Sequence, residues 1–166
     1  HHHELAAIIT EPVMCNNGCI APKPGFLEGI RKLCDDYGIA FILDEVITGF
    51  RLGLGGAQAH YKVTPDLSIF AKAMGSGYPI SAIVGKTSWM DCISNSQVIH
   101  AGTMNACNST VAAALATIKV LEDDVETYAR MYALGNKLML GIRYIAARYG
   151  ITMLIEGPGP VFSTTF

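Results

Sequence analysis

The sequence predicts an α/β fold with a mostly parallel sheet, and three stretches near its start carry that prediction. Residues 39–43 are five apolar residues in a row, which is typical of a strand buried on both faces. Residues 5–9 form a similar run that we interpret as a second buried strand. Between them, residues 26–37 place apolar side chains at helical spacing, and Gly38 follows where a helix C-cap is expected. Strand, helix and strand in this order form a βαβ unit.

An acidic residue follows each of these two predicted strands. Glu11 comes after Thr10 at the end of the first strand, and Asp44 comes directly after the second. Because the carboxyl ends of parallel strands meet at one edge of a sheet, where open α/β sheets bind ligands, the two acids are expected to converge there. Burying the Asp44 carboxylate without a partner would cost much free energy, so we expect a cation, a metal or a strong donor to face it.

The remainder of the chain continues the alternation of strands and helices. The 166 residues suffice for one domain with a sizeable core. Loops are expected over 14–25 and, as a flexible glycine-rich stretch, over 53–56. Because the chain stops on an apolar strand, we expect it to be a fragment. Further strands are predicted over 67–70, 80–85, 151–155 and 161–166, and further helices over 86–93, 108–121 and 124–149.

Composition excludes several classes of function. The chain is 51% hydrophobic and 16% charged with a net charge of −2, so neither nucleic acid nor an anionic membrane is indicated as a partner. No apolar run reaches the roughly 18–20 residues of a membrane span, and no signal peptide is recognisable. The five scattered cysteines favour free thiols in a reducing cytosol over a zinc site, so we expect a cytoplasmic protein. Residues 1–3, all histidine, are interpreted as a tag remnant.

Lys72 is the second unusual residue, because it stands at the end of the predicted strand 67–70 and is followed by a glycine-containing loop. One interpretation is a buried or half-buried salt bridge with Asp44. The other is a Schiff-base lysine with an acid that serves the ring nitrogen of a cofactor. Position alone favours the salt bridge, and the motifs around these two residues reverse that preference.

Those motifs occur in an order and at separations that run unbroken from about residue 4 to 121. They are residues 9–13, 24–29, 44–51, 64–67, 72–79 and 101–103. Together they resemble the class III, fold-type I aminotransferases that use pyridoxal 5'-phosphate, with the closest likeness to glutamate-1-semialdehyde 2,1-aminomutase and its near relatives.

The resemblance implies a three-layer α/β fold with a mostly parallel sheet, present here as a partial domain. Residues 4–150 would be the central part of the cofactor-binding large domain. Residues 151–166 would be the start of a truncated C-terminal small domain, and the stretch 122–166 matches the family more loosely.

The resemblance also implies roles for the residues at the predicted sheet edge. Lys72 matches the lysine that carries the cofactor as a Schiff base, and its freed amine is the natural base for moving the substrate Cα proton. Asp44 matches the aspartate that pairs with the pyridinium nitrogen and keeps it protonated. Val46 matches a residue that packs on one face of the cofactor ring, and strand alternation would point it to the same side as Asp44. An ordinary core valine explains its residue type equally well.

Four more residues complete the implied site. Asn16 matches an asparagine near the phenolic oxygen of the cofactor, with a simple turn residue as the alternative. Glu11 matches a glutamate on the substrate side of the pocket, often paired with an arginine that nothing in this chain identifies. Gly102 and Thr103 match a backbone group and a threonine that reach the cofactor phosphate of the neighbouring subunit in a homodimer. The alternative for Thr103 is the N-cap of the helix that follows.

The function implied is transfer of an amino group between an amino acid or amine and a keto acid or aldehyde. Ile47 stands where many class III transaminases carry glutamine, and it matches the aminomutase branch, so intramolecular amino transfer is an alternative. Residues 104–108 differ from the sequence that is usual in the family at this point, which leaves the partner-subunit contact less well supported.

Two further interpretations come from other classes of protein. The family's phosphate-binding loop and ring-stacking aromatic would lie upstream of residue 1, and its carboxylate-binding arginine downstream of residue 166. A non-catalytic scaffold that lacks the phosphate loop therefore stays open as an alternative. A Rossmann-type dehydrogenase is disfavoured, because no glycine-rich turn follows Ile9 or Leu43.

Overall fold

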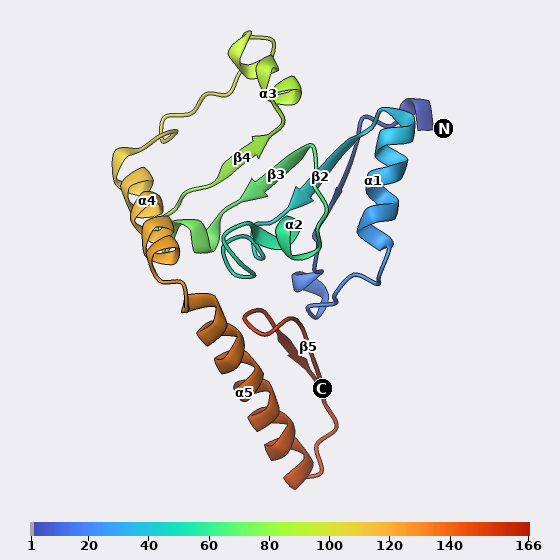
Figure 1. Cartoon of the computed structure of the whole chain (residues 1–166), viewed down its shortest axis with the longest axis vertical. Helices are drawn as coiled ribbons and strands as arrows, with labels where there is room; N and C mark the ends of the chain where they lie inside the picture. The colour runs from blue at the N-terminus through green and yellow to red at the C-terminus, as the bar shows by residue number, and fades with distance from the viewer. Residues whose placement is uncertain (1) are drawn as a thin grey trace.

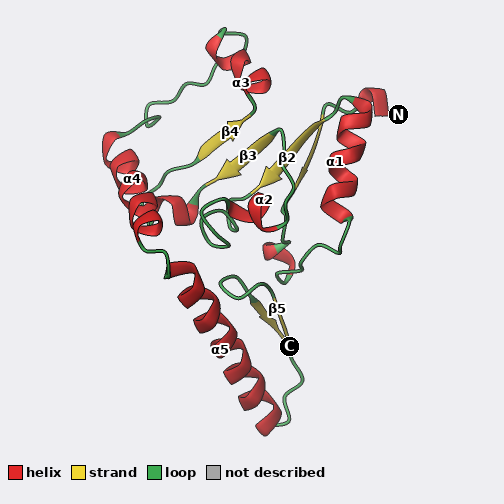
Figure 2. Cartoon of the chain, viewed as in Figure 1, coloured by secondary structure: helices red, strands yellow, loops and turns green. Residues whose placement is uncertain are grey.

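The computed structural model describes residues 2–166 and contains a four-stranded sheet in the order β1-β2-β3-β4 (Figures 1 and 2). The first three strands, β1 (Ala7–Thr10), β2 (Ala40–Asp44) and β3 (Leu67–Phe70), run parallel. The fourth, β4 (Ala82–Gly85), is antiparallel to β3. The prediction of a mostly parallel α/β sheet is therefore confirmed. His1, the first residue of the predicted tag remnant, lies outside the described residues.

The helices predicted from apolar spacing all form; α1 has the predicted bounds, and the ends of the others are shifted by up to three residues. One further short helix, α2, was not predicted, and it begins inside the stretch expected to be a flexible loop. The helices are α1 (Phe26–Tyr37), α2 (Gly56–His60), α3 (Thr87–Ser94), α4 (Asn108–Asp123) and α5 (Thr127–Arg148). The 3-10 turns are η1 (His2–Glu4), η2 (Cys15–Asn17) and η3 (Lys72–Gly75). The last two strands, β5 (Leu154–Glu156) and β6 (Ser163–Thr165), form an antiparallel hairpin.

Helix α1 covers one face of the sheet. Its side chains Leu27 and Cys34 are buried against Phe41 and Leu43 of β2. The predicted C-cap is confirmed, because Gly38 has φ +66° and its N–H donates to the carbonyl of Cys34. This packing forms the main hydrophobic core and places the carboxyl end of β2 beside that of β1.

The opposite face of the sheet is more open than the sequence predicted. Ile9 of β1 is 58% exposed and Ile83 of β4 is 50% exposed. Among the described residues α1 covers only one face, so the expectation that the first strand is buried on both sides is wrong here. Asp44 pairs with Ile69, which pairs in turn with Ile83, so the Asp44 side chain belongs to this open face.

The amino-terminal end of β3 is fixed by a buried carboxylate. Asp66 accepts hydrogen bonds from Arg31 Nη1 at 2.9 Å, from the N–H of Phe41 at 2.8 Å and from Lys86 Nζ at 2.7 Å. These donors come from α1, from β2 and from the residue after β4. Burial by itself would raise the pKa of Asp66, but the three hydrogen bonds outweigh it and hold that pKa below its ordinary value of 3.8.

This cluster predicts an acid-sensitive contribution to stability. Because the pKa of Asp66 is lower in the folded chain than in the unfolded one, its stabilisation is complete above the ordinary value and is lost as the pH falls through the lowered one. Replacing Asp66 with asparagine leaves Arg31 and Lys86 without their common partner, and should lower the free energy of unfolding by about 3 kcal/mol at pH 7. Urea unfolding at pH 7 and pH 3 measures this, and a variant that loses as much at pH 3 as at pH 7 would contradict it.

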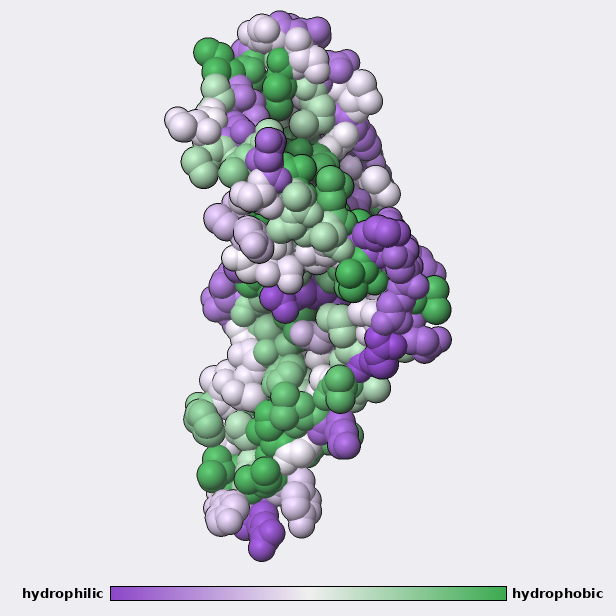
Figure 3. Space-filling view, turned by 90° about the vertical axis from the view of Figure 1, so that its left-hand side faces the viewer, coloured by the Kyte–Doolittle hydropathy of each residue, from purple (hydrophilic) through white to green (hydrophobic). Residues whose placement is uncertain are grey.

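Helix α5 and the β5–β6 hairpin extend from the sheet as an arm (Figure 1). On the side shown in Figure 3, hydrophobic side chains gather over the lower part of the molecule, where α5 lies. Leu134, Leu138 and Leu140 of this helix are each more than half exposed. No helix formed by residues 2–166 is long and apolar enough to cross a lipid bilayer.

Candidate active site

The strand register brings three of the predicted site residues to one edge of the sheet. Thr10 pairs with Leu43, so Glu11 lies at the level of Asp44. Asp44 pairs with Ile69 of β3, and Lys72 follows the end of that strand by two residues. The convergence of the two acids at a carboxyl edge, expected from the βαβ unit, is therefore observed, and Lys72 joins them.

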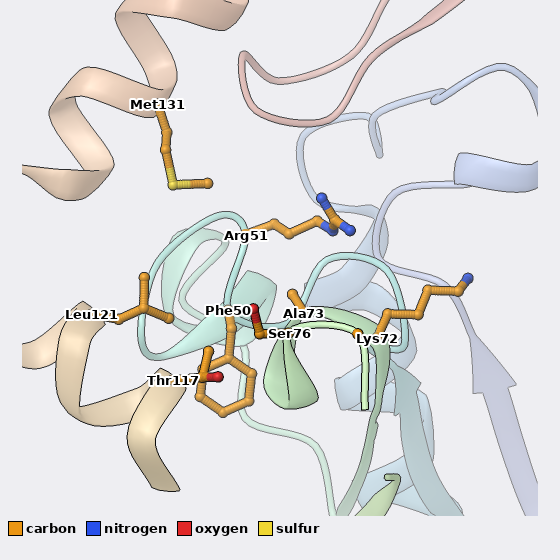
Figure 4. Close-up of a pocket in the computed structure, with 9 residues that line it drawn as sticks. Phe50, Arg51, Lys72, Ala73, Ser76, Thr117, Leu121 and Met131 are labelled. Carbon is orange, nitrogen blue, oxygen red and sulfur yellow. The ribbon is translucent and has the colours of Figure 1, made fainter. Parts of the chain in front are cut away.

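Lys72 begins the η3 turn with a left-handed backbone, φ +46°, which is uncommon for a residue with a Cβ. Its side chain is exposed and extends away from Thr117 and Leu121 (Figure 4). It forms no ion pair with a carboxylate in residues 2–166. The salt bridge with Asp44, the alternative that position alone favoured, is not observed.

Asp44 is half-buried, and the single hydrogen bond that residues 2–166 give it comes from the N–H of Val46 to Oδ1 at 3.0 Å. Within the described part of the chain no cation contacts it. Of the partners expected for this carboxylate, the chain thus supplies only a backbone donor. Because β2 ends at Asp44, Val46 lies in a turn, and strand alternation does not decide where its side chain points.

The neighbouring acid, Glu45, has a structural role that the sequence analysis missed. Its side chain is fully buried and accepts hydrogen bonds from Thr48 Oγ1 at 3.1 Å, from the N–H of Gln58 at 3.1 Å and from the N–H of Ala57. Burial raises its pKa, and these hydrogen bonds oppose the rise. Glu45 thereby closes the loop after β2 onto the start of α2.

Gly56 makes this closure possible. It has φ +64°, and a Cβ built there would lie 2.4 Å from Glu45 Oε2. A side chain at this position would push the carboxylate away from its donors. An acid directly after a buried strand, followed by a Gly-Gly pair, was the sequence signal for this contact.

The loop after β1 holds two more of the predicted site residues, Glu11 and Asn16, in contact with each other. Asn16 Nδ2 donates to Glu11 Oε1 at 2.9 Å, and the N–H of Cys15 donates to Glu11 Oε2 at 3.0 Å. Glu11 is thus held by its own loop, with no arginine partner among residues 2–166. Burial, with smaller contributions from Cys19 and Glu11, raises the pKa of Cys15 to about 12, while the positive charge of Lys72 opposes the rise.

The structure does not bring Gly102 and Thr103 to the sheet edge where Asp44 and Lys72 lie. Both are exposed and lie in the loop between α3 and α4, beyond β4 and away from β1 (Figure 1). The carbonyl of Gly102 accepts a hydrogen bond from the N–H of Asn105 at 3.0 Å. Helix α4 begins at Asn108 with Cys107 as its N-cap, so Thr103 is not a helix cap.

A cavity of about 510 Å³ adjoins Lys72. It lies between the turn after β2, the η3 turn and helices α4 and α5 (Figure 4). Two of its lining residues are cationic and none is acidic. The lining consists of Phe50, Arg51, Lys72, Ala73, Ser76, Gly77, Thr117, Leu121 and Met131.

Solved structures of transaminases share this architecture. A transaminase with PLP bound superposes with a TM-score of 0.93 at 25% identity over 99% of this chain. An omega-transaminase from Sphaerobacter thermophilus gives 0.88 at 32% identity over 96% of this chain, and an ornithine aminotransferase from Plasmodium yoelii gives 0.78 at 28% over 92%. The chain covers 39%, 36% and 40% of those three chains, respectively.

The sheet, its register and these neighbours define the class of protein: this is part of the large domain of a fold-type I transferase. The family model described as "Aminotransferase class-III" matches residues 1–166. The chain therefore belongs to the class III aminotransferase family, as the motifs indicated.

Proposed function

We propose that this chain is the central part of a pyridoxal-phosphate-dependent aminotransferase, and that Lys72 and Asp44 hold the cofactor. The observation that carries the proposal is their placement: an amine and a carboxylate at the carboxyl ends of neighbouring parallel strands, each without an ionic partner in residues 2–166. An unpaired, half-buried carboxylate fits a protonated ring nitrogen, since that cation offsets the cost of removing the charge from water.

Each residue at the edge then has a distinct task. Lys72 is the covalent attachment point, and its amine, once released, removes and returns the proton at the substrate Cα. Asp44 keeps the ring nitrogen protonated. The cofactor, when bound, supplies the electron sink that this proton transfer requires. The hydrogen bond from Val46 fixes the Asp44 carboxylate, and the Val46 side chain packs against the ring.

The loop after β1 forms the other side of the proposed pocket. Asn16 and Glu11 are hydrogen-bonded to each other, so the loop presents them as one unit. We propose that Asn16 lies near the phenolic oxygen of the cofactor and that Glu11 faces the substrate. The substrates are a small-molecule amino donor and a keto or aldehyde acceptor.

The complete enzyme is proposed to be a cytoplasmic homodimer in which Gly102 and Thr103 reach the cofactor phosphate of the other subunit. Their exposed position, apart from Lys72 of the same chain, is compatible with that role. Residues 4–150 would be the central part of the large domain and residues 151–166 the start of the small one. The separate two-stranded sheet of β5 and β6 supports a boundary in that region.

Ile47 favours a second candidate, intramolecular amino transfer of the glutamate-1-semialdehyde aminomutase kind. It packs against the cluster of Val13 and Leu52 beside the site, where a glutamine would place its amide among apolar side chains. Incubation with an amino aldehyde as the sole substrate distinguishes the two reactions, because only an aminomutase converts it without a separate amino donor.

Covalent labelling tests the main proposal. The purified chain, mixed with excess pyridoxal phosphate and reduced with borohydride, should carry the added mass on the peptide that contains Lys72. Lys137, also exposed, serves as the internal control for nonspecific modification. Equal labelling of Lys72 and Lys137 would contradict the proposal. If this chain stays colourless while a longer one turns yellow and is labelled at Lys72, the scaffold interpretation holds for this piece only.

A further inference from the structure

The turn of the β5–β6 hairpin, residues 157–161, lies between helix α5 and the loop after β1 (Figure 1). It packs tightly on α5, because a Cβ built at Gly135 would lie 2.1 Å from the carbonyl oxygen of Gly159. On the other side of the turn, a Cβ built at Gly157 would lie 3.1 Å from the Cβ of Cys19 in the loop after β1. The turn is therefore wedged between a helix and a loop that are far apart in the sequence.

Val161 extends this contact into the hydrophobic core. It is 8% exposed and belongs to the same cluster of buried side chains as Val13 and Cys19, which both come from the loop after β1. The N–H of Val161 donates to the carbonyl of Pro158 at 2.9 Å, and this hydrogen bond closes the turn that presents the side chain. The hairpin thus supplies part of the apolar surface on which the loop after β1 rests.

The same loop carries Glu11 and Asn16. Glu11 accepts hydrogen bonds from the N–H of Cys15 and from Nδ2 of Asn16, so it is held by residues that follow it in the loop. The Sγ of Cys19 donates to the carbonyl of Cys15 at 3.8 Å. A shift of the loop at Val13 or Cys19 therefore reaches Glu11, through the backbone and through these hydrogen bonds.

We propose that the turn of the β5–β6 hairpin positions Glu11 and Asn16 for the reaction, with Gly157 and Val161 as its positioning residues. The inference rests on the proposed function, because it takes Glu11 as a group that faces the substrate. Gly157 allows the close approach to the loop, and Val161 fills the space beneath it. A reacting group that is misplaced by about 1 Å can cost a large part of the rate, so a support of this kind affects binding and turnover from a distance.

Thiol labelling tests the contact without any turnover. In Gly135→Ala the added methyl group pushes the carbonyl of Gly159 away from α5. Gly141→Ala is the matched control in the same helix, because a Cβ there meets no atom of the described residues within 4 Å. N-ethylmaleimide, applied at mildly alkaline pH to the complete enzyme and located by peptide mass, reports the opening of the loop at Cys19. Cys34 is the internal reference, since burial raises the pKa of both thiols and Cys34 lies in the core beneath α1.

The expected result is a local opening. Gly135→Ala should increase the labelling rate of Cys19 about tenfold or more and leave Cys34 protected, whereas Gly141→Ala should behave as the unaltered enzyme. Unchanged labelling of Cys19 in Gly135→Ala would overturn the proposal. If that variant exposes Cys34 as well, Val161→Ala decides the question, because it removes two methyl groups without adding a clash. It should still label Cys19 faster than Cys34, and equal rates for the two thiols would overturn the proposal.

Kinetics of the complete enzyme separate positioning from a merely structural role. Gly135→Ala should raise KM for the amino donor about tenfold with a smaller change in kcat, because the loop that carries Glu11 is displaced and the η3 turn is not. The double variant Glu11→Gln, Gly135→Ala should have the KM of Glu11→Gln alone. A loss of kcat at unchanged KM, or two additive effects on KM, would contradict the assignment. If Lys72 of the unaltered enzyme is not labelled by borohydride reduction, the proposed function fails, while the labelling of Cys19 still decides whether the hairpin holds the loop.

Discussion

Replacing Lys72 with alanine is expected to abolish amino-group transfer and leave the fold nearly unchanged. The variant loses both the covalent attachment point and the base at the substrate Cα, and the base alone contributes roughly 10²–10⁴-fold to such reactions. The expected loss in kcat of the complete enzyme is therefore about 10³-fold or more. The side chain is exposed and forms no ion pair within residues 2–166, so its removal disrupts no packing. Transaminase assays with circular dichroism on the same preparations measure both effects.

Two controls make this result specific. Lys137→Ala removes an equally exposed lysine from α5 and should retain full activity. Lys72→Arg keeps the positive charge but cannot form the covalent link at neutral pH, so it should be as inactive as the alanine variant. A Lys72→Ala enzyme that still transfers amino groups would show that another residue is the reacting amine.

Most of the fold followed from local pattern. Helix α1 and strand β3 have the bounds expected from apolar spacing, because each is packed mainly by residues that show this spacing. Helix α2 was missed because its start depends on Glu45, which lies eleven positions before Gly56 and reaches it only once the chain has turned. The open face of β1 was missed for a related reason: an apolar run does not say which element covers it.

The site was predictable in part for the same physical reasons. The parallel register necessarily brings Glu11, Asp44 and Lys72 to one edge, so order along the chain was enough to place them. The roles of Asn16 and Thr103 came from resemblance alone. Arg51 lies in one of the family-like motifs without an assigned role, and only coordinates reveal that its Nε is buried without a hydrogen-bond partner among residues 2–166.

Asp44→Asn is expected to reduce the rate by about 10²-fold or more while the cofactor still binds, though more weakly. The asparagine amide is uncharged, so it no longer stabilises a proton on the ring nitrogen, and the electron sink is weakened. The fold should tolerate the change, since the carboxylate has one hydrogen bond, from the N–H of Val46 to Oδ1, and the amide oxygen of asparagine accepts it equally well.

The measurement combines kcat, cofactor affinity from absorbance titration and the midpoint of thermal unfolding. Asp36→Asn is the matched control, because Asp36 is exposed on α1 and its one ion pair within residues 2–166 is with Lys32. That variant should match the unaltered enzyme in all three quantities, because an exposed i,i+4 pair contributes little to stability. An unchanged rate in the Asp44→Asn enzyme would show that Asp44 has only a structural role, at the end of β2. A lower rate together with a lower unfolding midpoint would place its effect on the turn at Val46 instead of the cofactor ring.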